Sequence, residues 1–223
     1  MNPHWVKDCA AVIPCLDEEA TIGHLVPAVR VCLEEVIVVD DGSADRTAEL
    51  AEKAGANVLR HKTTRGKGSA LQTGWRHALN AGFKWVVSMD GDGQHSPEDI
   101  PAFFRCAEEK PVPLVVGNRM SDGEQMPWLR RHVNRWMSNQ LSGKSGRPLP
   151  DSQCGFRLMN LEAWSALPIT TTHFETESEV LLAFLAAGHA VEFVPIQVIY
   201  KNEQSKIAPF RDTVRWLRWF AKV

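Results

Sequence analysis

Residues 85–95 read WVVSMDGDGQH, an apolar segment that runs directly into two aspartates separated by one glycine. The apolar part predicts a buried strand over 85–90, with Asp90 and Asp92 at its carboxyl end. Two carboxylates at this spacing can face one ion. Aspartate and glycine also form tight turns on their own account, so this stretch by itself is compatible with a purely structural turn.

A second stretch repeats the pattern nearer the N-terminus. Residues 36–41 predict another buried strand, and this one ends in Asp40 and Asp41. Further short apolar runs occur at 9–14, 57–60 and 114–117. Two predicted strands that both end in paired carboxylates favour a ligand site over two unrelated turns.

Segments with helical spacing separate these strands, at 18–33, 46–54, 69–81 and 97–108. The alternation of strands and helices predicts an α/β fold, a mostly parallel Rossmann-like sheet flanked by helices. Such sheets bind ligands at the carboxyl ends of their strands, where the paired aspartates are expected to gather. The second half is less regular and predicts a basic, Trp-rich stretch over 128–140, a loop over 143–155, a helix over 177–187 and a strand over 191–199.

Composition narrows the class of protein. A chain of 223 residues with 44% hydrophobic and 23% charged residues can bury one large core, so we expect a single domain. The net charge of -2 supplies no overall attraction for nucleic acid, and no nucleic-acid partner is expected. Five cysteines without a C-x-x-C pair indicate neither a disulfide framework nor a zinc site, and fit a reducing cytosol. No secretion signal and no apolar run long enough to span a bilayer are recognised.

The C-terminal segment 209–223 has a different character. Basic residues recur there at helical spacing, at Arg211, Arg215, Arg218 and Lys222. Apolar residues form a second stripe, at Phe210, Val214, Leu217 and Ala221. The aromatic residues Trp216, Trp219 and Phe220 lie beside that stripe. This pattern predicts a helix that lies on a membrane surface. A structural helix that covers the sheet is the alternative.

Several motifs together resemble the inverting glycosyltransferase family 2. They are Val12-Ile13-Pro14 with Asp17-Glu18-Glu19, then Val39-Asp40-Asp41-Gly42-Ser43, then Asp90-Gly91-Asp92. The segments GKG at 66–68, GNR at 117–119 and DSQCGFR at 151–157 are similar to the dolichol-phosphate mannosyltransferase and polyprenyl-phosphate glycosyltransferase branch. The resemblance covers nearly the whole chain. It implies a GT-A fold and a single-displacement transfer of a hexose from a nucleotide sugar, of the GDP-mannose or UDP-glucose type, to a polyprenyl phosphate.

The resemblance also implies roles for the donor residues. Pro14 and Glu19 would line the nucleoside pocket, the turn of Asp40 and Asp41 would hold the nucleoside, and Asp41 would meet the base. Asp17 stands in the same site, at a position where asparagine is usual in the family.

A divalent metal is expected at the Asp90 loop. Asp90 and Asp92 would approach the ion and the diphosphate, with Gln94 assisting from the same loop. Mg²⁺ or Mn²⁺ prefers oxygen ligands and usually completes its shell with water and substrate phosphates. The ion would neutralise the departing nucleoside diphosphate.

Basic residues are candidates for phosphate contact. Lys67 lies between two glycines that let a backbone approach phosphate, although a glycine-rich helix entry is the alternative and the P-loop spacing is absent. Arg119 and Arg130 match arginines that contact donor or acceptor phosphate in the related branch, and Arg157 belongs to the same set. Arginine suits this work because its planar fork donates two hydrogen bonds. For the neighbouring Arg131 and Arg135, a solvated helix face is an equal alternative.

The acceptor side rests on two further residues. The resemblance implies that Asp151 lies nearest the acceptor and is a candidate general base, with Asp92 and Arg119 completing the catalytic set. A phosphate acceptor is already largely ionised at neutral pH, since its second pKa is about 6, so orientation can matter more than proton removal. The alternative for Asp151 is a loop-capping aspartate. Lys206, after Ser205, matches a serine-lysine pair near acceptor phosphate, although residues 200–204 differ from the family's usual arginine and glycine.

The expected organisation is one glycosyltransferase domain over 1–223, with a nucleotide-sugar-binding half (1–120), an acceptor half (121–208) and an amphipathic C-terminal helix (209–223). The expected location is cytoplasmic, peripheral at the cytoplasmic membrane face, and the oligomeric state is not predicted. Two alternatives remain, a transferase of the same fold with a soluble or protein-bound acceptor, and a nucleotide-sugar-binding regulator without turnover. Retention of Asp90, Asp92, Asp151 and Arg157 favours catalysis. A nucleotidyltransferase is disfavoured, because its glycine-rich N-terminal loop is missing, and the histidines show no ligand spacing.

Overall fold

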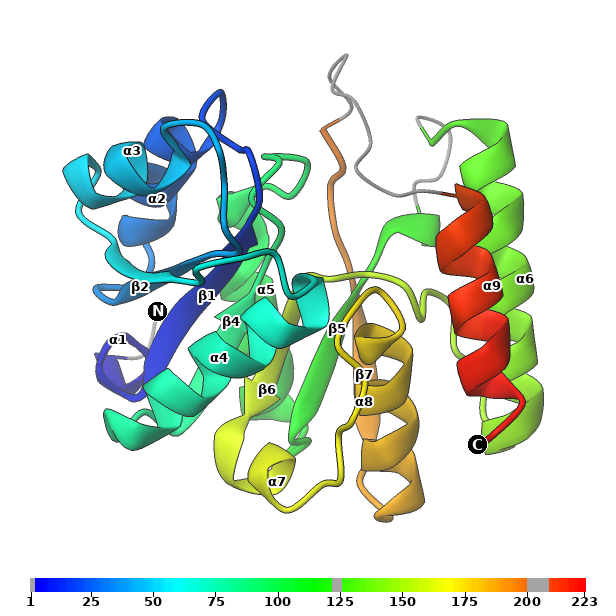
Figure 1. Cartoon of the computed structure of the whole chain (residues 1–223). Coiled ribbons are helices and arrows are strands. Elements are labelled where there is room, and N and C mark those ends of the chain that lie inside the picture. The colour runs from blue at the N-terminus through cyan, green and yellow to red at the C-terminus, as the bar shows by residue number, and fades with distance from the viewer. Residues whose placement is uncertain (1–2, 122–125, 200–208) are drawn as a thin grey trace.

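The structure is a computed structural model that describes residues 3–121, 126–199 and 209–223 (Figure 1). Within these residues, seven strands form one sheet in the order β3-β2-β1-β4-β6-β5-β7. The strands are β1 (Cys9–Cys15), β2 (Val36–Asp40), β3 (Asn57–Arg60), β4 (Trp85–Ser88), β5 (Leu114–Asn118), β6 (Arg157–Asn160) and β7 (Val191–Pro195). Strand β6 runs antiparallel to β4 and β5, and every other pair is parallel. The prediction of a mostly parallel α/β sheet is confirmed.

The burial of each strand explains its sequence. Every residue of β1 and of β2 is buried, because helices cover both faces of the sheet at its centre. Strands in that position read as continuous apolar runs, not as alternating ones. At the sheet edge, β3 is only partly buried, and its two end residues are exposed.

Helices cover both faces of this sheet. They are α1 (Pro3–Asp8), α2 (Ile22–Arg30), α3 (Thr47–Lys53), α4 (Lys67–Asn80), α5 (Ile100–Glu109), α6 (Trp128–Ser145), α7 (Leu161–Ser165), α8 (Thr176–Ala186) and α9 (Pro209–Phe220), with a 3₁₀ turn at Pro97–Asp99 before α5. Helix α7 contacts both α4 and α8 on one face, which lies in front in Figure 1. On the other face α5 and α2 both contact the 3₁₀ turn, and Trp5 of α1 stacks on Phe104 of α5.

Two predicted boundaries in the second half were wrong, and one strand was missed. The predicted loop over 143–155 begins inside a helix, because α6 continues to Ser145 and ends at Gly146 in the left-handed region. The strand predicted over 191–199 ends at Pro195. Strand β6 was not predicted at all, since its four residues follow directly on the glycine-containing motif and carry no periodicity of their own.

The C-terminal helix packs on the protein through a different stripe from the one predicted to meet a membrane. Trp216 is 2% exposed and donates from Nε1 to Ser178 Oγ of α8 at 2.9 Å. Trp216 also lies 5.7 Å, centroid to centroid, from Trp136 of α6. In contrast, Leu217 of the predicted apolar stripe is 42% exposed. The structure therefore favours the alternative, a helix that belongs to the packed domain. Among the described helices, none has the length and apolarity needed to cross a bilayer.

Candidate functional site

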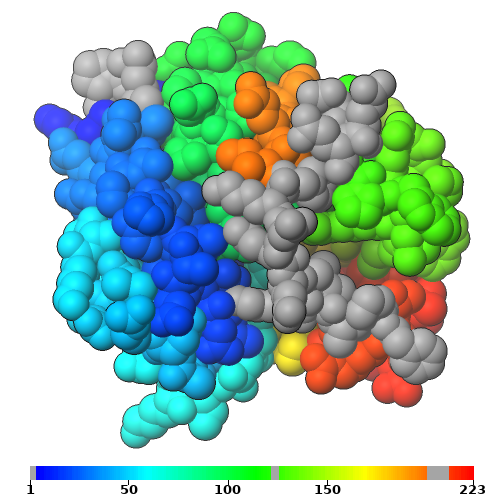
Figure 2. Space-filling model, turned by 90° about the horizontal axis from the view of Figure 1, so that it is seen from above, coloured from blue at the N-terminus to red at the C-terminus, as the bar shows by residue number. Residues whose placement is uncertain are grey.

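Hydrogen bonds join the loops that follow β1, β2 and β4. The backbone N–H of Asp17 donates to Ser43 Oγ at 2.9 Å, and the N–H of Ala44 donates back to Asp17 Oδ1 at 2.8 Å. From the same β1 loop, the Thr21 hydroxyl donates to the backbone oxygen of Gly91 at 2.6 Å. The three loops therefore form one connected rim at the carboxyl ends of the strands, on the side viewed in Figure 2.

Asp17 adopts the left-handed backbone region, with φ of 52°. Among residues with a side chain, aspartate and asparagine tolerate this region best, because a short polar group can bond locally. Here the carboxylate does so by accepting the Ala44 N–H. An asparagine Oδ1 would accept the same bond, so the departure from the family pattern at this position preserves the loop contact.

The carboxylate of Asp41 is directed toward the loop between β3 and α4. Oδ1 accepts from the backbone N–H of Arg65 at 2.9 Å, and Oδ2 accepts from that of Gly66 at 2.8 Å. His61 Nδ1 also lies 2.6 Å from Oδ1, and the imidazole is buried. The prediction that Asp41 meets the base did not include these partners. His61 had no signal in the sequence beyond its place directly after a strand.

Asp40, the last residue of β2, is completely buried. Its Oδ1 accepts the Ser43 N–H at 2.9 Å, and its Oδ2 lies 2.9 Å from Arg60 Nε. The carboxylate thus shapes the turn after β2 and ties it to the neighbouring strand.

Pro14 and Glu19 lie at different depths. Pro14 is buried within β1, in register with Val39 of β2. Glu19 is exposed, and its Oε2 lies 3.2 Å from Arg46 Nε. The predicted nucleoside residues therefore comprise a buried strand end and a solvent-facing loop that borders it.

Lys67, the first residue of α4, is held between two carboxylates. Its Nζ lies 2.7 Å from Asp90 Oδ1 and 2.7 Å from Glu177 Oε1 of α8. Burial by itself lowers the pKa of Lys67, but the charges of Asp90 and Glu177 more than offset this and raise the pKa above its ordinary value. Burial likewise favours a raised pKa for Asp90, yet the Lys67 ammonium holds it well below its usual range. Lys67 and Asp90 thus stabilise each other in their charged forms.

Glu177 was not predicted as a site residue. It lies in the acid-rich first turn of α8, where acidic residues are expected because they interact favourably with the helix dipole. Nothing in the sequence therefore indicated its contact with Lys67. The available signal was an acid in a helix whose other residues are largely apolar.

Glycines lie close to this ion pair at positions where a larger side chain would clash with neighbouring atoms. A Cβ added at Gly155 would lie 2.7 Å from Asp90 Oδ1 and 3.1 Å from Lys67 Nζ. A Cβ at Gly66, where φ is +103°, would lie 2.5 Å from the Thr172 oxygen. The glycines beside Lys67 thus allow α4 to pack closely against the segment before α8. They were expected from the sequence to let the backbone approach a phosphate, and this packing was not predicted.

The loop after β4 also carries Asp92 and Gln94. Asp92 Oδ1 accepts the Gln94 backbone N–H at 3.0 Å, and Gln94 Oε1 accepts from Arg130 Nη1 at 3.2 Å. In the described part of the chain, no group of three or more histidine, cysteine, aspartate or glutamate side chains is arranged to hold a metal. The donor set here is two carboxylates and an amide, all oxygen ligands. It fits Mg²⁺ or Mn²⁺ that takes its remaining ligands from substrate phosphates and water.

His95 follows this loop in a buried position. Its Nδ1 accepts the Asp90 backbone N–H at 3.4 Å, and its ring packs on Phe156 at 5.2 Å between centroids. Burial lowers its pKa to about 4, so the imidazole is neutral at physiological pH.

Arg119 and Asp151 form a buried bidentate ion pair. Arg119 Nε lies 2.7 Å from Asp151 Oδ2, and Nη2 donates to Oδ1 at 2.8 Å. The Arg119 backbone N–H donates to Oδ2 as well, at 3.1 Å. Burial opposes ionisation of Asp151, but Arg119 holds its pKa below the usual value. A carboxylate in this setting is a permanent anion that fixes Arg119, and it is poorly placed to take up a proton.

The Arg157 guanidinium is enclosed by backbone. It donates to the oxygens of Cys154 at 2.7 Å, Glu177 at 2.7 Å and Ser152 at 3.0 Å. Arg157 therefore fastens the 151–157 segment to the start of α8, which carries Glu177. The structure assigns it packing contacts where phosphate contact was expected.

The remaining predicted residues fall elsewhere. Lys206, with Ser205 and residues 200–204, lies outside the described residues. Arg131 is half-buried and Arg135 is exposed on α6.

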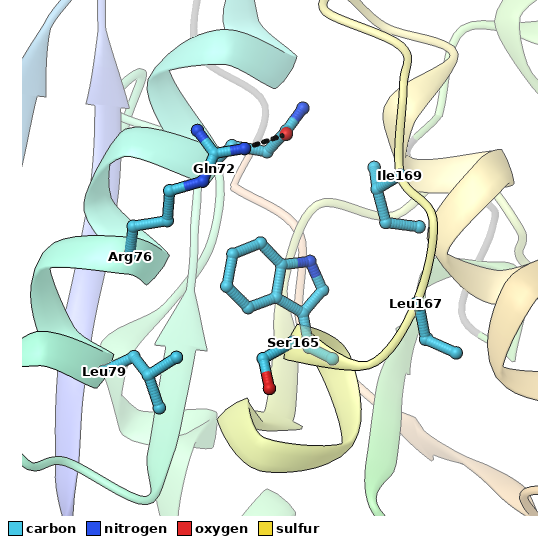
Figure 3. A pocket seen from close by; sticks show the side chains of 7 residues that line it. Gln72, Arg76, Leu79, Ser165, Leu167 and Ile169 are labelled. Atoms are coloured by element: carbon cyan, nitrogen blue, oxygen red, sulfur yellow. Dashed lines mark hydrogen bonds between the residues drawn. The ribbon is translucent and has the colours of Figure 1, made fainter.

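A surface hollow of about 170 Å³ lies between α4 and α7, away from this site (Figure 3). It is bordered by Gln72, Arg76 and Leu79 of α4 and by Ser165, Leu167 and Ile169. Arg76 Nη2 donates to Gln72 Oε1 at 3.0 Å on its rim. These residues lie along the middle and far end of α4, whereas the site residue Lys67 opens the helix, so the hollow is not the candidate site.

Comparison with known families identifies one family model. The model described as Glycosyl transferase family 2 matches residues 10–167. This range contains β1 to β6 and every described member of the predicted site.

Relatives and solved structures agree with that match. The chain is 29% identical to UDP-N-acetylglucosamine–dolichyl-phosphate N-acetylglucosaminyltransferase of Methanococcus voltae, over 85% of this chain and 84% of that protein. It is 32% identical to undecaprenyl-phosphate mannosyltransferase of Micrococcus luteus, over 68% of this chain and 62% of that protein. One similar solved structure is glucosyl-3-phosphoglycerate synthase from Mycobacterium tuberculosis, in complex with Mn²⁺, uridine diphosphate and phosphoglyceric acid. It superposes with a TM-score of 0.74 at 21% sequence identity, over 96% of this chain and 75% of that one.

Proposed function

This chain belongs to glycosyl transferase family 2 and is a glycosyltransferase, and we propose that it moves a hexose from a nucleotide sugar to a polyprenyl phosphate with inversion at the anomeric carbon. The observation that carries the proposal is the connected rim formed by the loops after β1, β2 and β4, the last of which carries Asp90 and Asp92. Relatives named as polyprenyl-phosphate transferases support the acceptor class.

The donor would lie along the rim. The loops after β1 and β2, stiffened by the bonds between Asp17, Ser43 and Ala44, would hold the nucleoside. The diphosphate would then extend toward Asp90 and Asp92 at the end of β4. Pre-formed hydrogen bonds in these loops lower the ordering cost of donor binding.

Asp90, Asp92 and Gln94 would hold the divalent ion. When bound, Mg²⁺ or Mn²⁺ supplies positive charge to the departing diphosphate. Lys67 already contacts Asp90 at 2.7 Å, so it keeps that carboxylate ionised and ready to act as a ligand. Arg130 holds Gln94 from α6 and fixes the orientation of its amide.

The transfer step itself needs little proton chemistry. An oxygen of the acceptor phosphate forms a bond to the anomeric carbon as the bond from that carbon to the diphosphate oxygen breaks, and the electron pair leaves with the nucleoside diphosphate. The acceptor phosphate is largely ionised at neutral pH, because its second pKa is about 6. We therefore assign Asp151 to the orientation of Arg119 and not to proton removal, and we assign Arg119 to the acceptor side of the site.

A panel of donors and acceptors tests this proposal. The purified chain is incubated with GDP-mannose, UDP-glucose or UDP-N-acetylglucosamine, each with Mn²⁺, Mg²⁺ or EDTA. The acceptor is a short polyprenyl phosphate, the matching polyprenol without phosphate, or phosphoglyceric acid as a soluble phosphorylated acceptor. We expect a glycolipid product only with the phosphate-bearing lipid and a divalent ion. Product on the soluble acceptor alone would replace the proposed acceptor class with the soluble one, and donor binding without any product would favour a regulator.

A further inference from the structure

Positive charge is concentrated on helix α6. Its sequence, WLRRHVNRWMSNQLSGKS, contains three arginines and one lysine and no acidic residue. The whole chain, by contrast, carries a net charge of -2. This 18-residue element therefore carries four positive side chains and no negative one, within a chain whose net charge is slightly negative.

The same helix exposes large apolar side chains. Trp128 is 73% exposed and Leu129 is 60% exposed, and Val133 and Trp136 are also exposed. Positions 129, 133 and 136 follow the i, i+4, i+7 spacing of a single helical stripe. The opposite side of α6 buries Asn134, Met137, Ser138 and Leu141 against the protein. The helix thus packs inward through a side of mixed polar and apolar residues, and it exposes an apolar stripe to solvent.

Helix α9 supports α6 from the side. The two helices stand next to one another at one edge of the molecule in Figure 1, and Figure 2 shows both at the outer edge from above. Trp216 of α9 meets Trp136, and Lys144 Nζ lies 5.3 Å from the centre of the Phe220 ring. These contacts involve the aromatic residues of α9 and part of Trp136, which stays 43% exposed, whereas Trp128 at the start of α6 is 73% exposed.

We propose that the outward face of α6, formed by Trp128, Leu129, Val133, Arg135 and Trp136 and called here the basic-aromatic face, docks on the surface of an anionic membrane. Tryptophan and leucine beside arginine is the composition of helices that lie in the membrane interface, where rings enter the headgroup region and cations meet acidic lipids. A second copy of the chain is a less suitable partner for this face. A symmetric dimer contact would bring two α6 helices together, and both carry only positively charged side chains. Nucleic acid would leave the apolar stripe of Leu129 and Val133 without a partner.

Docking through this face has a consequence for the candidate site. Arg130 lies on the same turn as Trp128 and Leu129, and it donates to Gln94, whose backbone N–H is bonded to Asp92. The membrane-facing end of α6 is therefore joined to the Asp90–Asp92 loop by the hydrogen bond from Arg130 to Gln94. The purpose of docking rests on the proposed function, since it would bring the site to an acceptor embedded in the membrane.

Vesicle binding tests the inference without donor or acceptor. The full chain is sedimented with phosphatidylcholine vesicles, with or without phosphatidylglycerol. We expect binding that requires the anionic lipid and weakens as salt rises, because exposed charges are screened. Arg135→Glu should weaken vesicle binding about thirtyfold, because it changes the charge near the membrane surface by two units and each unit is worth about 1 kcal/mol. Trp128→Ala should weaken it about tenfold through lost apolar burial.

Matched controls lie on other surfaces of the chain. Arg105→Glu makes the same charge reversal on exposed α5, and Val31→Ser removes an exposed apolar group after α2, so both should bind vesicles as the wild type does. Equal binding by Trp128→Ala and the wild type would overturn the proposal, as would a concentration-dependent dimer that Trp128→Ala disperses.

Transfer assays keep this inference distinct from the proposed function. The docking variants should lose transfer to polyprenyl phosphate in vesicles but keep it with the acceptor in detergent. Vesicle binding by a protein that glycosylates no lipid would contradict the proposed acceptor and leave the docking surface supported.

Discussion

Lys67 Nζ lies 2.7 Å from Asp90 Oδ1, which places an ammonium group directly on a carboxylate expected to bind metal. The same ammonium contacts Glu177, so one cation serves two acids from different helices and loops. The arrangement keeps Asp90 ionised over the whole physiological pH range. It also makes the geometry of the candidate site dependent on the packing of α4 against α8.

Removal of the Lys67 charge should destabilise the protein. Lys67→Met leaves Asp90 and the buried Glu177 without their shared cation, and breaking this partly buried network should cost up to about 3 kcal/mol of unfolding free energy. Glu177→Gln added to Lys67→Met should restore part of that loss. The measurement is urea denaturation, with Lys84→Met as the control because it breaks only a surface pair with Asp8. Equal stability of Lys67→Met and Lys84→Met would contradict the buried network.

A methyl group at Gly155 should disturb the site without a change in charge. In Gly155→Ala the added Cβ would approach Asp90 and Lys67, and the pair would have to shift. Misplacement on this scale can cost about a hundredfold in rate. Gly143→Ala is the control, because a Cβ there meets nothing within 4 Å. The steric account fails if Gly155→Ala transfers sugar at the wild-type rate.

The strands and the acidic residues at their carboxyl ends could be predicted from the sequence, because both are features of short continuous segments. Strands β1, β2 and β4 are buried on both faces, so they appear as continuous apolar runs, and the acids that follow them mark the carboxyl ends. Sheet neighbours then bring those ends together. The loop contacts between Asp17 and Ser43 follow from that neighbourhood.

Long-range partners could not be read in the same way. Lys67 and Glu177 are far apart in sequence, and each has an ordinary local explanation, a helix entry and a helix dipole. Strand β6 is antiparallel and only four residues long, so it lacks a period of its own. In α9, Trp216 and Leu217 are adjacent and both apolar, and only the contact with Ser178 decides which faces inward.

The Asp151–Arg119 pair predicts a specific dependence of stability on pH. Because Arg119 lowers the pKa of Asp151, the folded state binds its proton less readily than the unfolded state, where an aspartate titrates near about 3.9. The stabilisation is therefore fully present above that value and is lost as pH falls through the lower folded pKa. Asp151→Asn should cost about 3 kcal/mol between pH 5 and 8, roughly the loss expected when one partner of a buried pair is removed.

Urea titrations of Asp151→Asn and the wild type at a series of pH values measure this difference. The difference should stay constant from neutral pH down to about pH 5 and shrink only in stronger acid. A difference that changes between pH 6 and 8 would mean that another group, and not Asp151, is being titrated.

Cysteine reactivity offers an independent check on the packing of the site. Burial raises the pKa of Cys154 to about 12 and also raises that of Cys9. Cys32 and Cys106 are only partly buried, although burial raises their pKa values too, so they differ from the other two mainly in access to the reagent. Thiolate is the reactive form, so iodoacetamide at pH 8 should label Cys32 and Cys106 in the native protein and leave Cys9 and Cys154 unlabelled until it unfolds. Peptide mass spectrometry reads the labelled positions. Rapid native labelling of Cys154 would mean that the 151–157 segment is not packed as described.

The most direct measurement is the rate at which labelled hexose moves from its nucleotide donor to a short polyprenyl phosphate, compared between the wild type and Asp92→Asn. Glu98→Gln is the matched control, because it neutralises an exposed acid six residues further along the same segment. The account predicts metal-dependent product from the wild type and from Glu98→Gln, and at least about a hundredfold less from Asp92→Asn, as expected when a charge-stabilising group is lost from the transition state. Product formation by Asp92→Asn at the wild-type rate, with or without metal, would contradict the central claim.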